Sequence, residues 1–329
     1  MKKYKDKIKS SYFIVNKVYL FVIFLLLTIS DLTLAFAYFI ASLFIFLWKS
    51  LTYKLPMDVK VDIPFETYVY KVTDKRELKL DLYYPPTKIG HSRPLIYFCH
   101  GGGWISGFRN QSNNVSWCKF LASRGFIVSS IDYRYGYKNS MDDILRDFTD
   151  GLEYLKKHSK KLHIDKDNIV LMGLSAGGHL SLLYAAYNAL LDNSEKIQGI
   201  KAVVAYYAPS NLKDIFSSDT KSLFAKFGAS QTLNGRPTDI EEIYDYYSPI
   251  NWISERMLPT LLVHGKLDEV IPFSSTVELF KRLKKHNIPS ELYVHKTAGH
   301  SFDTRLKDLT TINILEKTLR YLKKSVKGG

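Results

Sequence analysis

The chain has 329 residues, of which 46% are hydrophobic and 24% charged, and its formal net charge is +14. This length allows one large domain with a sizeable core or two small domains, and the composition is ordinary for a globular protein. Nine lysines and three aspartates lie in the first 60 residues, so this part supplies +6 of the net charge. The remaining excess is scattered through helix-like segments, which argues against nucleic-acid binding and for a solvated basic surface. The two cysteines, Cys99 and Cys118, form no C-x-x-C pair and are too few for a disulfide framework.

A basic flank and a long apolar run begin the chain. Residues 1–17 carry six lysines, and residues 18–48 are almost wholly apolar. A helix of about thirty residues would be about 45 Å long, more than the roughly 30 Å of a hydrocarbon core. We therefore expect a membrane-anchored protein with the lipid bilayer as a partner. The anchor is either one tilted transmembrane helix or a helical hairpin that bends at Ser30 and Asp31.

The side of the membrane stays open at this stage. A single span would place the rest of the chain outside, whereas a hairpin would keep it in the cytoplasm. A cleaved signal peptide is disfavoured, because the apolar run is too long and no A-x-A site follows it.

After a linker over 49–64, residues 65–329 alternate between strand-like and helix-like segments. The expected strands lie near 65–71, 78–84, 95–99, 126–131, 169–173, 202–207, 260–264 and 291–295. The expected helices lie near 114–123, 142–158, 179–191, 274–286 and 306–324. The first two strands predict a hairpin at one edge, and the alternation of the others predicts a mostly parallel sheet of about eight strands with helices on both faces. In such α/β folds the functional residues lie at the carboxyl ends of the strands.

A serine occupies one of the predicted strand-to-helix corners. Gly173-Leu174-Ser175-Ala176-Gly177 fits the pattern G-x-S-x-G, between a buried strand and a helix. Such a corner strains the serine backbone and lifts its hydroxyl clear of the sheet, while the glycines allow close packing. Ser175 is therefore a candidate nucleophile, and an incidental serine in a glycine-rich turn is the alternative.

A nucleophilic serine needs a base, and the base needs a carboxylate that orients it. His300 follows the last expected strand, and Asp268 follows the strand before it. The chain order serine, aspartate, histidine is the one expected of this fold. His264 and His100 are rival bases, but each ends a strand beside glycine, which suits a residue that shapes a turn. Glu269 is the rival carboxylate.

The run His100-Gly101-Gly102-Gly103-Trp104 follows the expected strand at 95–99. Consecutive glycines allow backbone N–H groups to converge on one point, where they can hold the oxyanion of a tetrahedral intermediate. We expect the amides of Gly102, Gly103 and Ala176 to form this oxyanion hole. A phosphate-binding loop is disfavoured, because the chain has no G-x-x-x-x-G-K-[ST] pattern.

Taken together, these motifs resemble the α/β-hydrolase superfamily, and in particular its H-G-G-G-type carboxylesterases of the hormone-sensitive-lipase-like and acetyl-esterase-like branch. The resemblance covers about residues 65–325. Its motifs are His100-Gly101-Gly102-Gly103-Trp104, Asp132-Tyr133-Arg134, Gly173-Leu174-Ser175-Ala176-Gly177-Gly178, Ser248-Pro249, Asp268 and His300. The resemblance implies that Ser175 is the nucleophile, His300 the general base and acid, and Asp268 its partner.

Two departures from that branch leave the substrate open. Leu174 stands where many members have aspartate, and Tyr135-Gly136-Tyr137 stands where they usually read Leu-Ala-Pro. The motifs also resemble a neighbouring branch of acetyl-xylan, feruloyl and prenylcysteine esterases and arylformamidases.

The stretch 210–252 interrupts the alternation and is rich in aromatic residues, so we expect it to form a lid or cap over the site. Trp104, Phe224, Phe227 and Tyr247 are the candidates to line an apolar substrate pocket. Ordinary packing beneath a helical cap is the alternative for these side chains.

The sequence thus predicts a membrane-anchored serine hydrolase that cleaves a small-molecule or lipid-like carboxylic ester through an acyl-enzyme, with no cofactor and no metal. An amidase, formamidase or serine peptidase on the same fold is the first alternative. A catalytically inactive, membrane-tethered binding module is the second, and the filled triad and oxyanion positions weigh against it.

Overall fold

The computed structural model describes residues 20–23, 25, 38–41, 44, 53–74, 76–86 and 92–327. It divides the chain into two units, Met1–Tyr53 and Lys54–Gly329. In the first unit, the described residues before Tyr53 are helical and mostly exposed.

The predicted membrane segment, residues 18–48, lies mostly outside the described residues, and the basic flank 1–17 lies outside them entirely. In the part of the chain that the structure describes, no helix has the length and apolar character needed to cross a membrane. The prediction of a transmembrane helix or hairpin is corrected on this finding, and the membrane-anchored localisation and the bilayer partner are withdrawn with it. Hydropathy measures the composition of a segment, whereas a span needs about twenty consecutive apolar residues in one helix.

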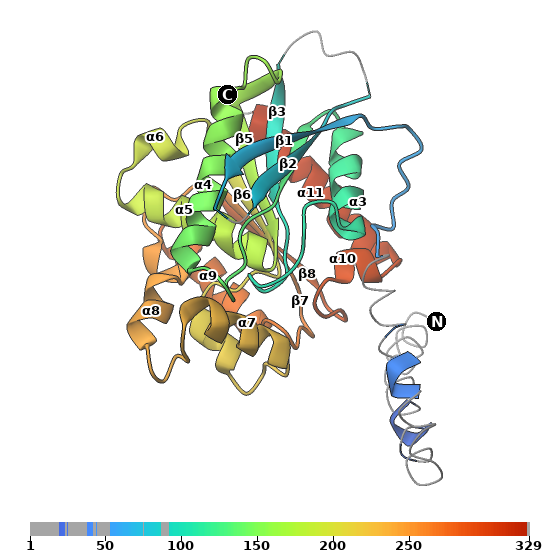
Figure 1. Cartoon of the computed structure of the whole chain (residues 1–329), viewed down its shortest axis with the longest axis vertical. Helices are drawn as coiled ribbons and strands as arrows, with labels where there is room; N and C mark the ends of the chain where they lie inside the picture. The colour runs from blue at the N-terminus through green and yellow to red at the C-terminus, as the bar shows by residue number, and fades with distance from the viewer. Residues whose placement is uncertain are drawn as a thin grey trace. The chain divides into compact units, whose positions relative to one another are not determined.

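One sheet of eight strands forms the centre of the second unit, counted over its described residues (Figure 1). The strands are β1 (Phe65–Val72), β2 (Glu77–Tyr83), β3 (Arg93–Cys99), β4 (Ile127–Ile131), β5 (Ile164–Leu174), β6 (Ile200–Tyr206), β7 (Thr260–Gly265) and β8 (Ser290–His295). They follow the order β1-β2-β4-β3-β5-β6-β7-β8 across the sheet. β2 pairs antiparallel with β1 and β4, and all other neighbours are parallel. The predicted mostly parallel sheet of about eight strands is confirmed.

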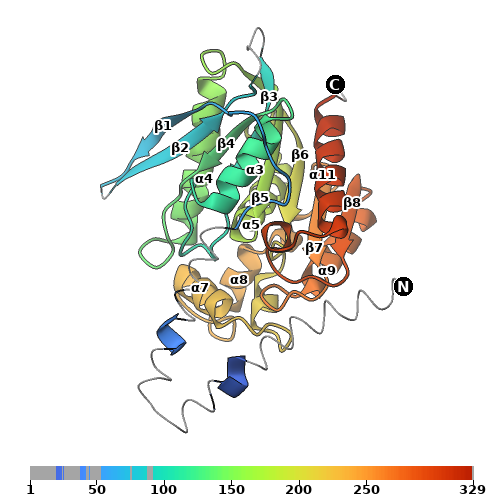
Figure 2. The ribbon, with the colours of Figure 1, turned by 90° about the vertical axis from the view of Figure 1, so that its right-hand side faces the viewer.

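Helices cover both faces of the sheet (Figure 2). One face carries α4 (Met141–Lys157), α5 (Ala176–Leu190) and α9 (Phe273–Lys285), and the other carries α3 (Ser112–Ala122) and α11 (Leu309–Lys327). Two shorter helices, α6 (Ser194–Ile197) and α10 (Phe302–Arg305), follow α5 and β8.

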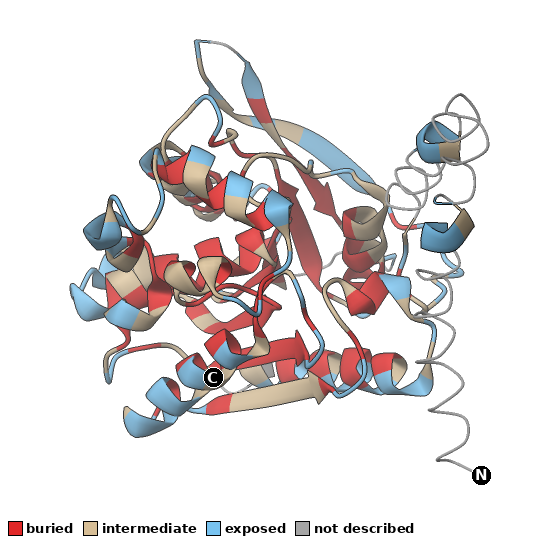
Figure 3. Ribbon diagram, turned by 90° about the horizontal axis from the view of Figure 1, so that it is seen from below, coloured by how far each residue is buried: buried red, intermediate tan, exposed pale blue. Residues whose placement is uncertain are grey.

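The strands supply two separate cores, because successive side chains of a strand point to opposite faces. In β3, Leu95, Tyr97 and Cys99 belong to the core beneath α4 and α5, while Ile96 and Phe98 belong to the core beneath α3 and α11. Figure 3 shows the central strands buried and the helices exposed on their outer sides. Apolar runs without polar alternation are what a sheet covered on both faces requires.

Local sequence signals fix the helix ends as well. At the start of α4, the Ser140 side chain accepts a hydrogen bond from the Asp143 amide, and the Asp143 side chain accepts one from the Ser140 amide. Such a capping box satisfies two amides that the helix itself leaves unpaired. Lys156 and Lys157 in the last turn face the negative end of the helix dipole.

A cap of short helices separates β6 from β7. It consists of the 3₁₀ helix η1 (Leu212–Phe216), α7 (Leu223–Leu233), α8 (Glu241–Tyr246) and the 3₁₀ helix η2 (Pro249–Trp252). The stretch expected as an insertion, 210–252, therefore contains these four short helices. α7 packs closely on the loop after β3, since a Cβ atom at Gly228 would lie 2.6 Å from the Gly103 carbonyl oxygen. The cap consequently lies at the carboxyl ends of the parallel strands.

Candidate active site

A serine occupies the sharp corner between β5 and α5. Ser175 has φ 50° and ψ −117°, which is a strained combination for a residue with a side chain. The glycines on either side make the corner possible: a Cβ atom at Gly173 would lie 2.2 Å from the backbone of Gly177, and one at Gly177 would lie 2.1 Å from the Cys99 carbonyl oxygen. The Ser175 amide donates to the Tyr206 carbonyl oxygen over 2.8 Å, which ties the corner to β6. The serine hydroxyl is thereby held at the carboxyl ends of the strands.

Two further loops bring side chains to this hydroxyl. His300 lies in the loop after β8, and Asp268 lies in the loop after β7. Nε2 of His300 is 3.0 Å from Oγ of Ser175, and Nδ1 is 2.7 Å from Oδ2 of Asp268. Because an ionised carboxylate only accepts hydrogen bonds, Nδ1 carries the proton and Nε2 is left to accept from the serine. The structure therefore brings Ser175, His300 and Asp268 together in a line along which a proton can move.

Four donors converge on the Asp268 carboxylate. Oδ1 accepts from the amides of Val270 and Ile271 over 2.8 and 3.0 Å, and Oδ2 faces His300 and, at 3.1 Å, Nε2 of His264. Burial alone would raise the pKa of Asp268, but the charge of His300 and the hydrogen bonds from both histidines lower it below its ordinary value. Asp268 is consequently an anion at neutral pH.

His264 is a partner of the site that the sequence analysis assigned only to shaping a turn. Its Nδ1 lies 2.7 Å from Oγ1 of Thr276, and its Nε2 is shared between Asp268 and the Ile271 carbonyl oxygen, at 3.1 Å from each. No sequence signal indicated this contact, because a four-residue spacing brings side chains together in a helix, whereas His264 lies at the end of β7 and Asp268 in the loop after it.

A buried cluster packs against the imidazole of His300 through Tyr207. The Tyr207 ring lies with its centroid 4.5 Å from that of His300. Its hydroxyl donates to Asp303 over 2.8 Å, and the Trp117 indole donates to the same carboxylate over 2.7 Å. Asp303 is fully buried, and this burial raises the pKa of its carboxyl group. None of these three residues carries a motif that sequence reasoning could have used.

The loop after β3 has an unusual backbone. Gly102, Gly103 and Trp104 have φ values of 120°, 59° and 62°, so three residues in a row adopt positive φ. The Gly102 carbonyl oxygen accepts from the amide and the hydroxyl of Ser106, each over 3.0 Å, which turns this carbonyl away into the loop. Within the described part of the chain, the amides of Gly102, Gly103 and Ala176 donate no hydrogen bond. For Ala176 this follows from its place as the first residue of α5. These three amides are thus available to an oxyanion.

The Asp132-Tyr133-Arg134 motif anchors this loop. Asp132 accepts from the backbone amide and the guanidinium of Arg109 over 3.0 and 2.7 Å. The Tyr133 hydroxyl donates to the His100 carbonyl oxygen over 3.1 Å, and Arg134 pairs with the buried Asp147 of α4 over 2.8 Å. The motif therefore holds both ends of the glycine-rich loop to β4 and α4.

The four predicted pocket residues do not gather in one place. Phe224 of α7 lies directly over the glycine loop, since a Cβ atom at Gly103 would be 3.0 Å from its ring. Phe227 is 56% exposed and lines a different hollow on the outer side of α7. Only Phe224 is thus placed to contact a group bound beside the oxyanion loop.

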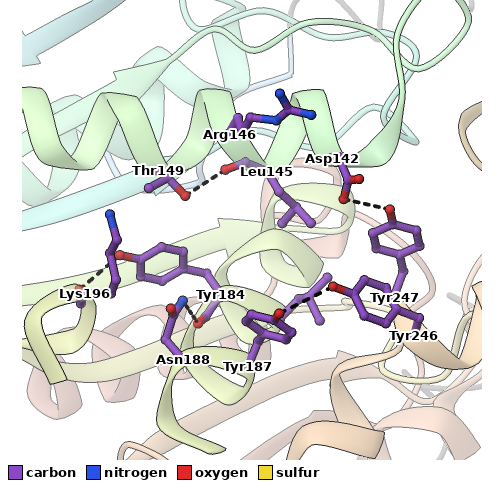
Figure 4. Close-up of a pocket in the computed structure, with 11 residues that line it drawn as sticks. Asp142, Leu145, Arg146, Thr149, Tyr184, Tyr187, Asn188, Lys196, Tyr246 and Tyr247 are labelled. Carbon is purple, nitrogen blue, oxygen red and sulfur yellow. Dashed lines mark hydrogen bonds between the residues drawn. The ribbon is translucent and has the colours of Figure 1, made fainter. Parts of the chain in front are cut away.

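Trp104 and Tyr247 lie elsewhere. The Trp104 side chain is buried and points away from solvent, with its ring packed edge-on against His179. Tyr247 belongs to a groove of about 300 Å³ along α4 and α5, where its hydroxyl donates to Asp142 over 2.7 Å (Figure 4). Ser175, Asp268 and His300 do not line this groove.

Over the described residues, no group of three or more histidine, cysteine, aspartate or glutamate side chains is arranged to hold a metal ion.

The fold is that of α/β-hydrolases of the carboxylesterase kind. The family profile BD-FAE matches residues 80–283, and the chain belongs to this family. The resemblance to α/β-hydrolase carboxylesterases that the sequence motifs suggested is confirmed.

Individual relatives and solved structures agree with this family assignment. A probable isoprenylcysteine alpha-carbonyl methylesterase from Oryza sativa subsp. japonica is 25% identical over 244 residues, which cover 70% of this chain and 55% of the relative. Esterase LipC from Mycobacterium tuberculosis is 28% identical over 229 residues, covering 66% of this chain and 54% of the relative. The apo form of Thermogutta terrifontis esterase 2 is 26% identical, with a TM-score of 0.65, over 82% of this chain and 97% of that chain. The chain spans about half the length of the first curated relatives it matches.

Proposed function

We propose that this protein hydrolyses carboxylic esters, with Ser175 as the nucleophile, His300 as the general base and acid, and Asp268 as the residue that orients and stabilises the imidazolium. The observation that carries this proposal is the continuous hydrogen-bonded line from Asp268 through His300 to Ser175, with distances of 2.7 and 3.0 Å. Membership of the BD-FAE family and the named esterases among the relatives support the same activity.

The geometry supports a two-step mechanism. Nε2 of His300 takes the proton of the Ser175 hydroxyl as Oγ attacks the ester carbonyl carbon, and the carbonyl oxygen becomes an oxyanion beside the free amides of Gly102, Gly103 and Ala176. His300 then gives its proton to the departing alkoxide, which leaves as the alcohol. Water, deprotonated by the same imidazole, attacks the carbonyl carbon of the acyl-enzyme. His300 then returns this proton to Oγ of Ser175 as the bond to the acyl group breaks, and the carboxylic acid leaves. No step needs a cofactor.

The substrate we propose is a small-molecule ester with a short acyl group. Phe224 offers an apolar surface next to Gly103 but also limits the space there. Thermogutta terrifontis esterase 2, whose chain is similar to this one, has been solved with butyrate and with propionate bound. The same enzyme has been solved phosphoramylated by tabun, which supports an organophosphorus probe as a reagent for Ser175.

The test is labelling by a fluorophosphonate probe, followed by turnover of a substrate panel. Wild-type protein should be labelled and Ser175→Ala should not. Ser181→Ala is the matched control in α5, the helix that follows Ser175. It should be labelled normally, because the Ser181 hydroxyl donates to the Gly177 carbonyl oxygen. Folded wild-type protein that takes up no label would contradict the proposal and favour an inactive binding module.

The panel separates ester from amide hydrolysis. p-Nitrophenyl acetate and butyrate should be cleaved, whereas the matching p-nitroanilides should be cleaved much more slowly. Faster cleavage of the anilides would replace the esterase assignment with an amidase.

A further inference from the structure

The glycine-rich loop contains a residue whose conformation needs an external anchor. Trp104 is the third consecutive residue with positive φ, and unlike the two glycines before it, it carries a large side chain. L-residues with side chains avoid this region unless the surroundings hold them there. The orientation of the amides just before Trp104 therefore depends on what fixes this tryptophan.

Two contacts fix it. The Gly136 amide donates to the Trp104 carbonyl oxygen over 2.9 Å, and the Trp104 indole N–H donates to Nδ1 of His179 over 3.3 Å. The two rings meet edge-to-face, with centroids 5.1 Å apart and planes at 83°. His179 is thus the side chain that accepts the hydrogen bond of the Trp104 indole.

The partners of His179 select one protonation state. Nε2 lies 2.7 Å from the Tyr247 carbonyl oxygen, which can only accept, so Nε2 carries the proton. Nδ1 is then an acceptor, which is what the Trp104 indole requires. Burial lowers the pKa of His179 to about 4, so the ring stays neutral at ordinary pH. Both ring nitrogens are therefore satisfied in one tautomer.

His179 also connects three parts of the site. It lies in the first turn of α5, where its amide donates to the Ser175 carbonyl oxygen over 2.9 Å. Tyr247 follows α8 of the cap and is itself held to α4 through Asp142 (Figure 4). The imidazole thus links the nucleophile helix, the glycine loop and the cap. Its side chain is completely buried, so it does not reach a substrate.

We propose that His179 is a positioning residue that holds the oxyanion loop in its active shape by accepting the Trp104 indole N–H and donating to the Tyr247 carbonyl. The proposal rests on the proposed esterase function for its kinetic consequences. It assigns a role in the reaction to a buried histidine that touches none of the reacting atoms.

Steady-state kinetics test the consequence for catalysis. His179→Leu should lower kcat for p-nitrophenyl butyrate by about 10- to 100-fold and leave KM within about twofold, because misplaced amides weaken only the transition state. His179→Gln places an acceptor and a donor on one amide group and should recover most of the lost kcat. Ser181→Ala, in the same helix α5, removes a buried hydrogen bond without touching Trp104 and should leave kcat unchanged.

A second kinetic comparison separates positioning from general damage to the fold. Trp104→Phe keeps an aromatic ring but removes the donor, so it should lower kcat about as much as His179→Leu. The double variant should then be little worse than either single variant. The affinity for a trifluoromethyl ketone inhibitor, which forms an oxyanion at Ser175, should fall in parallel with kcat/KM.

A spectroscopic measurement is independent of activity. The chain has four tryptophans, so protein labelled with ¹⁵N-tryptophan should give a small set of indole signals, and Trp104→Phe identifies the one of interest. In the wild type this indole N–H should be protected from hydrogen exchange. His179→Leu should remove the protection and His179→Gln should restore it.

These measurements distinguish the two proposals. A wild-type protein that hydrolyses no ester, yet loses Trp104 indole protection in His179→Leu, would contradict the esterase function and leave the anchor standing. Normal kcat in a folded His179→Leu variant, or additive losses in the double variant, would overturn the positioning role of His179. If His179→Leu does not fold, Trp104→Phe tests the same role: an unchanged kcat would overturn it, and a loss of about 10- to 100-fold would support it.

Discussion

Replacing Asp268 by asparagine is the sharpest perturbation that the site offers, because the side chain keeps its shape and loses one acceptor. The oxygen of the introduced amide can still accept from the amides of Val270 and Ile271, which contact Oδ1 in the wild type. The new NH₂ group then replaces Oδ2, where Nδ1 of His300 lies 2.7 Å away. Two donors face each other at this position, and the same conflict arises with Nε2 of His264 at 3.1 Å.

The size of the loss in kcat depends on how His300 can relieve the conflict between its Nδ1 proton and the introduced NH₂ group. It can move its proton from Nδ1 to Nε2, but Nε2 then faces the Ser175 hydroxyl as a donor and no base remains. In Ser-His-Asp triads this wrong tautomer lowers kcat about 10⁴-fold. Turning the amide over instead would face its NH₂ towards the Val270 and Ile271 amides and leave them unpaired, at about 1–3 kcal/mol each. We therefore expect Asp268→Asn to lower kcat about 10³- to 10⁴-fold, or about 4–5.5 kcal/mol.

The assay is the initial rate of p-nitrophenyl butyrate hydrolysis at pH 7.5, with folding checked by circular dichroism and the melting temperature. Glu269→Gln is the matched control, because Glu269 is the adjacent carboxylate and pairs with Lys221 at the surface over 2.8 Å. It should retain at least about a third of the wild-type rate. An Asp268→Asn variant within tenfold of wild type, or a Glu269→Gln variant impaired as strongly, would refute the assignment of Asp268.

Three further outcomes are expected. The pKa of Asp268 is lowered from its ordinary value of 3.8, so its carboxylate stabilises the fold above that pH and loses this effect as the pH falls. The difference in the free energy of unfolding between wild type and Asp268→Asn, measured with urea, should therefore shrink from pH 7 to pH 3. A difference that stays constant would contradict this. His264→Leu removes one donor from the Asp268 carboxylate and should lower kcat about 3- to 10-fold with KM unchanged in steady-state assays; an unchanged kcat would show that the contact is dispensable. Phe224→Ala should raise kcat/KM for p-nitrophenyl octanoate about tenfold relative to kcat/KM for p-nitrophenyl acetate, because the Phe224 ring lies over Gly103. Phe227→Ala should leave this ratio unchanged. Equal effects of the two substitutions would argue against the placement of Phe224.

The order and type of the elements could be predicted from the sequence, because the central strands of the sheet contain short apolar runs bounded by turn residues. The expected strands at 95–99, 202–207 and 260–264 correspond closely to β3, β6 and β7. The position of β3 between β4 and β5 could not be predicted from the sequence. Strand pairing is a contact between distant segments, and an apolar run does not indicate which strands it pairs with. The start of β5 at Ile164 was also missed, because the polar Asp165 and Lys166 hide a strand that pairs with Arg93 and Pro94.

The prediction of a transmembrane segment over 18–48 was wrong for a related reason. Its composition suits a lipid environment, but composition does not establish a continuous helix. In the described parts of the chain no helix meets that requirement.

In the site, the residues that could be found from sequence are those with a fixed motif or chain order. Ser175, Asp268 and His300 belong to this group, and their catalytic roles stay a proposal for the labelling and kinetic tests. His264, Tyr207 and His179 do not belong to it, because the direction of a buried side chain depends on packing that no local pattern encodes. His179 follows the glycine pair after the serine, where the sequence shows only the start of a helix.

The serine and the imidazole that faces it are 125 residues apart in the chain. β8, which precedes His300, is the last of the eight strands to be synthesised, and it joins the sheet at its edge beside β7. A growing chain therefore contains the serine corner well before it contains the histidine. On the proposed mechanism, nascent or prematurely released chains carry an unreactive hydroxyl, and catalytic competence arises only when this final strand docks.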